Sequence, residues 1–115
     1  MQDEKNLKHW TAIYCDGGTD FCYYDPLAIN DRYNEIKKIF SPILASKYTH
    51  YLKYKMNGIK NQSDKSSYCG YYCIRFIWLM INGLPFKDIT NMSTIVENEK
   101  NIKQFEKNLK EFEYI

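Results

Sequence analysis

The sequence lacks internal repeats, low-complexity runs and any stretch typical of a linker between domains. Its longest apolar stretch, Cys73 to Ile81, is interrupted by Arg75 and is too short to span a bilayer, so we expect no membrane partner. Residues 1–8 are polar and charged, without the apolar centre of a signal peptide. These absences predict a single domain over residues 1–115, located inside the cell.

The composition is that of a folded protein. Hydrophobic residues make up 44% of the chain and charged residues 26%, which excludes an intrinsically disordered polymer. Aromatic residues make up 17%, and eleven of them are tyrosines, so rings can build the core while hydroxyls hydrogen-bond at its edges. In a reducing compartment the four cysteines are expected to be thiols.

The net charge of +2 is unevenly distributed. Residues 37–65 contain seven lysines and one acid, a net charge of +6, which leaves −4 for the rest of the chain. A basic segment of this kind could bind nucleic acid or an acidic partner, or it could be a solvated surface.

Periodicity and turn residues predict the order ββα-β-ααα, an α+β domain. Asp16-Gly17-Gly18 predicts the turn of a hairpin, and Gly83 predicts the end of an apolar helix. The predicted strands are 7–15, 21–24 and 50–56, and the predicted helices are 30–44, frayed at Pro42, 68–82, 86–92 and 93 or 94–114.

Cys69 lies where the polar loop 57–67 meets the apolar helix. Helix N-termini favour anions and lower thiol pKa values, and the thiolate is the reactive form of cysteine. Gly70 would leave the neighbouring backbone open to a substrate, and N–H groups of the first turn could bind an oxyanion, with Gln62 adding its side-chain amide. Cys69 could also be a small buried apolar residue, the interpretation that we favour for Cys73.

His9 and Asp25 are the candidates for a base and its orienting acid. If the hairpin loop has three residues, opposed residues have numbers that add to 34, so His9 faces Asp25 directly. A two-residue Gly-Gly loop would pair Asp25 with Trp10 instead. A carboxylate opposite His9 would fix the imidazole tautomer. His50 has no acid beside it and is interpreted as structural, while Asp16 and Asp20 are interpreted as turn residues.

These residues carry a resemblance to a family. His9-Trp10, Tyr24-Asp25-Pro26, Gln62 and Cys69-Gly70-Tyr71-Tyr72-Cys73 resemble the adenovirus-type (adenain-like) maturation protease and the wider clan of SUMO and ubiquitin-like-protein-specific proteases. The match covers roughly residues 7–90 and keeps the order His, acid, Gln, Cys. The acid is Asp, as in the SUMO proteases. Only eight residues precede His9, whereas family members carry a sizeable segment there.

The resemblance implies a cysteine-protease fold, a small mixed sheet with helices, in which the catalytic Cys69 lies at the N-terminus of a buried helix. It also implies His9, Asp25 and Gln62 as the other catalytic residues. It implies cleavage at Gly-Gly or Gly-Ala sites of precursor proteins, with Trp10 and Gly70 lining narrow subsites. The protein would be a viral or virus-like maturation protease in the host cell or the virion. No metal or other cofactor is expected, but DNA or a peptide could act as an activator, with residues 37–65 as the nucleic-acid surface.

Three alternatives remain open at this level. By the same resemblance the chain could be a SUMO or ubiquitin-like-protein isopeptidase, or an inactive relative that only binds such a tail. A zinc module could instead use the cysteines together with His9, although the spacing Cys69-x₃-Cys73 is poor for a zinc site. In the hairpin considered above, Cys15 and Cys22 point to opposite faces of the sheet, which further disfavours a shared metal.

Overall fold

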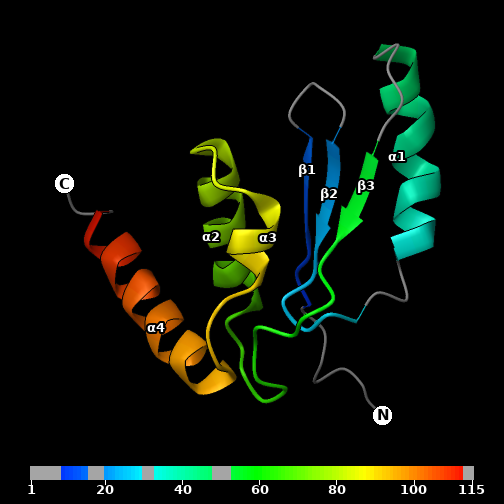
Figure 1. Cartoon of the computed structure of the whole chain (residues 1–115). Helices are drawn as coiled ribbons and strands as arrows, with labels where there is room; N and C mark the ends of the chain where they lie inside the picture. The colour runs from blue at the N-terminus through cyan, green and yellow to red at the C-terminus, as the bar shows by residue number, and fades with distance from the viewer. Residues whose placement is uncertain (1–8, 16–19, 30–32, 48–52, 113–115) are drawn as a thin grey trace.

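A three-stranded sheet forms the centre of the fold. In the computed structural model, which describes residues 9–15, 20–29, 33–47 and 53–112, the strands are β1 (Ala12–Cys15), β2 (Asp20–Tyr24) and β3 (Lys53–Met56). Their order is β1-β2-β3, with β1 antiparallel and β3 parallel to β2 (Figure 1). The predicted α+β class and the mixed sheet are therefore confirmed. Residues 48–52, which include the predicted start of β3 and His50, lie outside the described part, as does the Asp16-Gly17-Gly18 turn.

The register of the hairpin differs from the prediction. Ala12 pairs with Tyr24 and Cys15 with Phe21, so opposed residue numbers add to 36 rather than 34 or 35. The first strand begins at Ala12, and His9 and Trp10 precede it as irregular backbone. The prediction that His9 directly faces Asp25 is therefore wrong. The sequence could not fix the register because several loop lengths satisfy a Gly-Gly turn.

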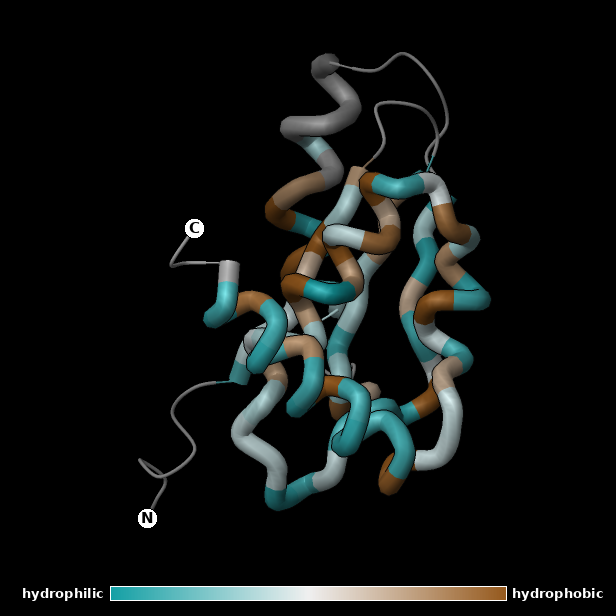
Figure 2. Tube along the Cα trace, turned by 90° about the vertical axis from the view of Figure 1, so that its left-hand side faces the viewer, coloured by the Kyte–Doolittle hydropathy of each residue, from teal (hydrophilic) through white to brown (hydrophobic). Residues whose placement is uncertain are grey.

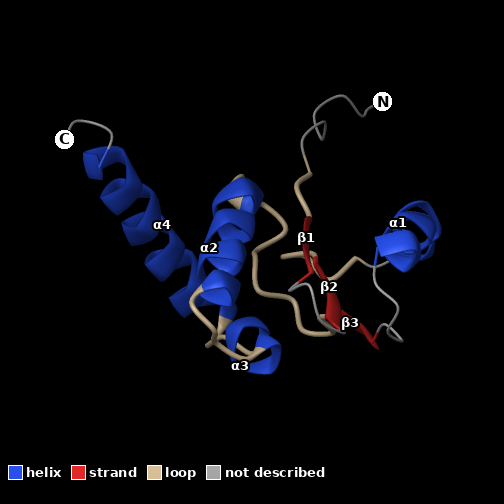
Figure 3. Cartoon of the chain, turned by 90° about the horizontal axis from the view of Figure 1, so that it is seen from above, coloured by secondary structure: helices blue, strands red, loops and turns tan. Residues whose placement is uncertain are grey.

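Helix α1 (Tyr33–Lys47) connects β2 to the parallel strand β3 and covers one face of the sheet (Figure 3). Parallel strands need such a crossover connection. The ring of Tyr33 lies 5.6 Å from that of Tyr23, and the Lys37 ammonium lies 4.2 Å from the centre of the Tyr54 ring. The helix continues through Pro42 and ends three residues beyond the predicted Leu44. Its predicted start, residues 30–32, lies outside the described part.

The other side of the sheet is covered by α2 (Cys69–Ile81), with α3 (Phe86–Thr90) packed beside it, and α4 (Ile95–Phe112) packs against α2 on the side away from the strands (Figure 3). The Tyr24 ring stacks on Phe76 of α2 at 4.6 Å, and Phe86 meets Phe76 edge-on at 5.8 Å. Most of α4 is hydrophilic (Figure 2), because it buries mainly one stripe around Ile102. This core fixes α2 against β1 and β2. It therefore places the N-terminus of α2 near the start of β1 and the end of β2, which lie next to each other in the sheet.

The helices end within a few residues of their predicted bounds. Gly83 follows α2 with a φ of +86°, the left-handed conformation expected of a glycine C-cap. α3 ends two residues before the predicted Met92, and Tyr114 lies outside the described residues. The helix that the resemblance describes as buried is buried along one side, at Cys69, Tyr72, Cys73 and Phe76. On its other side Ile74, Trp78 and Ile81 are 48%, 56% and 66% exposed. None of the described helices is long and apolar enough to cross a membrane.

Candidate active site

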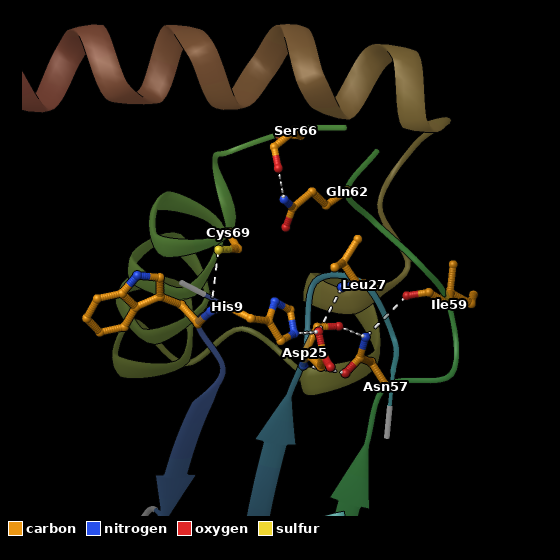
Figure 4. Close-up of polar contacts among 9 residues, drawn as sticks. His9, Asp25, Leu27, Asn57, Ile59, Gln62, Ser66 and Cys69 are labelled. Carbon is orange, nitrogen blue, oxygen red and sulfur yellow. Dashed lines mark hydrogen bonds and ion pairs between the residues drawn. The ribbon is translucent and has the colours of Figure 1, made fainter. Parts of the chain in front are cut away.

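His9 and Asp25 are in direct contact although they are not opposed in the sheet. The Nε2 atom of His9 lies 2.9 Å from Oδ1 of Asp25 (Figure 4). The carboxylate side chain is 1% exposed and the imidazole 36% exposed, so the imidazole meets solvent while the carboxylate is buried. Asp25 follows the last residue of β2, and His9 lies three residues before β1. His9 and Asp25 are sixteen residues apart in the sequence, and the start of β1 and the end of β2 bring them together.

The turn after β2 holds the carboxylate of Asp25. The Leu27 N–H donates to Asp25 Oδ1 at 2.9 Å, and the Ala28 N–H donates to the Asp25 carbonyl at 2.8 Å. Ala28 has a φ of +56°, a left-handed conformation that is uncommon for a residue with a Cβ. Asp25 Oδ2 is buried and has no hydrogen-bond partner among the described atoms. Oδ1 is thus the oxygen that orients His9.

Cys69 is the first residue of α2 and is 5% exposed. The backbone N–H of Trp10 donates to Cys69 Sγ at 3.4 Å, which places the residue after His9 directly on the sulfur (Figure 4). Sulfur at this position lies at the N-terminus of α2, where the N–H groups of the first turn have no partner within the helix. One short segment, His9-Trp10, therefore contacts both Cys69 and Asp25.

Trp10 and Gly70 also lie together beside Cys69. The position of a Cβ on Gly70 would be 3.6 Å from the Trp10 indole, an ordinary contact distance. The indole itself is 58% exposed. The side of Gly70 on which a Cβ would lie therefore faces the indole, while Gly70 itself is partly exposed. That Gly70 leaves its backbone open to a substrate stays a prediction. The exposed aromatic ring of Trp10 forms part of the surface next to Cys69.

Gln62 is 1% exposed on the loop that leads to α2. Its backbone N–H donates to the Pro26 carbonyl at 3.0 Å, so this loop is bound to the turn that contains Asp25. Its side-chain Nε2 donates to the Ser66 carbonyl at 2.8 Å, whereas Oε1 is buried without a partner among the described atoms. In Figure 4 Oε1 is turned toward the side of Cys69 and His9. Because Oε1 only accepts hydrogen bonds, a donor from Gln62 toward this side would have to be the second Nε2–H, the one that Ser66 does not use.

Two buried asparagines were not identified from the sequence. Asn57 bonds the backbone of Asp25, and Asn61 joins the Tyr24 hydroxyl at 2.7 Å to the Thr90 carbonyl at 2.9 Å. Both lie at the start of the predicted polar loop 57–67, where asparagine is typical of turns. Their local sequence carries no signal of burial, since their partners come from distant parts of the chain.

The other cysteines differ from Cys69. Burial raises the pKa of Cys73 to about 12, with a further increase from the nearby Cys69 and Asp25. Cys22 is fully buried and Cys15 is half-buried. Within the described residues, no three His, Cys, Asp or Glu side chains are placed to hold a metal ion. No observation here favours the zinc alternative.

The lysines of residues 37–65 belong to different elements. Lys37, Lys38 and Lys47 lie on α1, Lys53 and Lys55 on β3, and the other two, Lys60 and Lys65, on the loop before α2. Lys55 forms an ion pair with Asp20 at 2.9 Å, and Lys60 pairs with Asp64. This basic segment is therefore distributed over several elements rather than along a single helix.

The arrangement has the parts needed for acyl transfer. Asp25 holds Nε2–H of His9, which leaves the lone pair of neutral imidazole on Nδ1. Figure 4 shows Nδ1 on the side of the ring that faces Cys69 and Gln62. Comparison of the chain with models of protein families, with curated proteins and with solved structures finds no match.

Proposed function

We propose that the chain is a cysteine peptidase in which Cys69 is the nucleophile, His9 the general base and Asp25 its orienting acid. The observation that carries the proposal is the double contact of the segment His9-Trp10, with Asp25 through the imidazole and with Cys69 through the Trp10 N–H. The three groups come from three distant parts of the chain, and the nucleophile lies at a helix N-terminus. A purely structural role would not require a thiol, an imidazole and a buried carboxylate to lie next to one another in this sequence of contacts.

The reaction follows from these positions. His9 Nδ1 takes the thiol proton, and the Cys69 sulfur attacks the scissile carbonyl carbon, whose π electrons move to the oxygen. First-turn N–H groups of α2 and the amide of Gln62 stabilise that oxyanion. The imidazolium, held by Asp25, gives its proton to the leaving amine as the C–N bond breaks, leaving a thioester. His9 then deprotonates a water that attacks the thioester, and the thiolate leaves.

The proposed substrate is a protein or peptide with glycine at the cleavage site. The resemblance of the His9-Trp10, Asp25-Pro26, Gln62 and Cys69-Gly70 motifs to the adenovirus-type proteases supports this class. The exposed Trp10 indole beside Cys69 also supports it, because a bulky ring near the nucleophile leaves room for small residues only. The adenovirus-type protease that the sequence resembles is stimulated by DNA and by a peptide, and the test below includes DNA as the activator.

The direct test is labelling of purified protein with a Gly-Gly vinyl-sulfone probe and mapping of the modified cysteine by mass spectrometry. We expect labelling at Cys69 and hydrolysis of Gly-Gly peptides, measured with and without DNA. Selective processing of a ubiquitin-like C-terminal tail over short peptides would identify the isopeptidase alternative. Binding of that tail without turnover or labelling would identify an inactive relative and contradict the proposal.

Cysteine alkylation should distinguish Cys69 from Cys73. A thiol whose pKa is raised to about 12 stays protonated at neutral pH and becomes a thiolate only as the pH rises toward that value. At pH 7 to 8 iodoacetamide should therefore modify Cys69 while leaving Cys73 unmodified in the folded protein. Peptide mapping after quenching measures both sites, and the half-buried Cys15 is read separately in the same map. Equal modification of Cys69 and Cys73 in folded protein would contradict the assignment.

Gln62→Ala should lower turnover while leaving substrate binding nearly unchanged. Loss of one oxyanion donor typically costs about 10²–10³ in kcat, and KM is little changed because the interaction strengthens only in the transition state. Alkylation of Cys69, which forms no oxyanion, should keep its rate to within a small factor. The measurements are kcat, KM and the alkylation rate of each variant. Wild-type turnover in Gln62→Ala would show that the amide only binds Ser66.

A further inference from the structure

Asn57 bonds both backbone groups of Asp25, and we propose that it is a positioning residue for the acid of the proposed catalytic site. The inference rests on the proposed function. The Asp25 N–H donates to Asn57 Oδ1 at 2.9 Å, and Asn57 Nδ2 donates to the Asp25 carbonyl at 2.7 Å (Figure 4). Asn57 is 2% exposed, so water does not compete for these bonds.

This side chain continues the sheet beyond its last backbone pair. β2 and β3 are paired up to Tyr23 and Met56, and both strands end within the next residue. Past that point the carboxamide of Asn57 takes the place of a neighbouring strand, accepting from one peptide group of Asp25 and donating to the other. The backbone of Asp25 is therefore fixed on both sides, just where its side chain must meet His9.

The carboxylate is held through one of its two oxygens. Its Oδ1 accepts from His9 and from the Leu27 N–H, while its Oδ2 has no partner among the described atoms. A rotation of the Asp25 backbone would move Oδ1 away from the imidazole, and no bond to Oδ2 opposes it. The turn opposes this rotation through the Leu27 and Ala28 N–H groups, and Asn57 opposes it on the other side through both backbone groups of Asp25.

Asn57 also connects the acid to the loop that carries Gln62. Its Nδ2 donates a second bond, to the Ile59 carbonyl at 3.2 Å. The same loop returns to the turn after β2, because the N–H groups of Asn61 and Gln62 both donate to the Pro26 carbonyl, at 2.8 and 3.0 Å. One carboxamide thus fixes the position of Asp25 relative to the loop that places Gln62 near Cys69.

Another buried asparagine provides a matched control. Asn98 of α4 is 1% exposed and donates to the carbonyls of Asn61 and Ser93, both at 3.1 Å, without touching Asp25 or His9. Asn98→Ala and Asn57→Ala each remove a buried, hydrogen-bonded carboxamide, so both should lower the free energy of unfolding. Only the second should change the His9–Asp25 contact.

The readout is the His9 tautomer, measured by long-range ¹H–¹⁵N NMR, with the resonances assigned through His50→Gln. We expect wild type and Asn98→Ala to keep the proton on Nε2, and Asn57→Ala to populate both tautomers. A misplaced orienting group can cost about 10²-fold, so kcat should fall by that order in Asn57→Ala with KM nearly unchanged. If Asn57→Ala does not fold, Asn57→Ser keeps a polar hydroxyl but is too short to bond both backbone groups of Asp25.

The outcomes separate the two proposals. A wild-type tautomer and kcat in a folded Asn57 variant, with a loss of stability equal to that of Asn98→Ala, would overturn the positioning role. If the wild-type protein cleaves no Gly-Gly peptide, the proposed function fails. The tautomer comparison still decides whether Asn57 sets the geometry of His9 and Asp25, since it needs no substrate.

Discussion

Cys69→Ser should abolish peptide cleavage, with a loss on the order of 10⁶ in kcat, while leaving the protein folded. The Cys69 sulfur contacts the segment that carries His9, through the Trp10 N–H at 3.4 Å. A serine hydroxyl fits the same space but does not ionise to the nucleophilic form at a helix N-terminus. Turnover of a Gly-Gly peptide measures the loss, and circular dichroism with thermal unfolding checks the fold.

Cys73→Ala is the matched control for Cys69→Ser. Cys73 lies one helical turn further along α2, is 6% exposed and packs in the core with Tyr24 and Phe76. Alanine is preferred to serine there, because a hydroxyl in an apolar core needs a hydrogen-bond partner. The variant should lose stability and keep its kcat. A comparable loss of turnover in both folded variants would mean that Cys69 is not the nucleophile.

Asp25→Asn should lower kcat by about 10⁴ at unchanged fold. The buried carboxylate supplies the negative charge that stabilises the imidazolium of His9, and an amide supplies none. If the amide turns its nitrogen toward His9, the imidazole must also adopt the other tautomer and loses its lone pair on Nδ1. The pH profile of kcat/KM and the tautomer of His9 should change together.

Asp20→Asn is the control for the loss of charge. Asp20 opens the same strand that Asp25 follows, and it forms an ion pair with Lys55 that is partly exposed. Such pairs contribute about 0–1 kcal/mol, and Asp20 lies at the opposite end of β2 from the proposed site. The variant should keep wild-type turnover. Equal losses of activity in Asp20→Asn and Asp25→Asn would contradict the assignment. The loss would then come from the change in net charge or in stability, and not from the orientation of His9.

The hairpin shows how far a sequence argument can reach. The predicted register, with numbers adding to 34, is wrong by two residues, yet His9 and Asp25 are in contact. Side chains alternate between the two faces of a strand, so a shift of two keeps every residue on its face, whereas a shift of one reverses it. The prediction therefore had the correct face and the wrong partner. Asp25 lies at a strand end, where the turn lets the side chain reach diagonally to His9.

Local chemistry in the sequence determined the elements and the candidates. A glycine after an apolar run ended α2, alternating residues marked the strands, and the change from polar loop to apolar helix placed Cys69 at a helix start. These features depend on neighbours along the chain, so they can be read without the fold. The pairing of His9 with Asp25 was proposed from the expected hairpin and from the order of residues in the proteases that the sequence resembles.

Only the tertiary structure decided how these candidates are held. Asn57 contacts the backbone of Asp25, and Trp10 contacts both the sulfur of Cys69 and the surface of Gly70. The exposed side of α2 and the amide orientation of Gln62 were likewise set by packing and by the Ser66 carbonyl. Each depends on atoms from segments far apart in the chain, whose approach is fixed by the common core of Tyr24, Phe76 and Ile102. No pattern within a single segment encodes such a contact, because its free energy belongs to the pair and not to either residue.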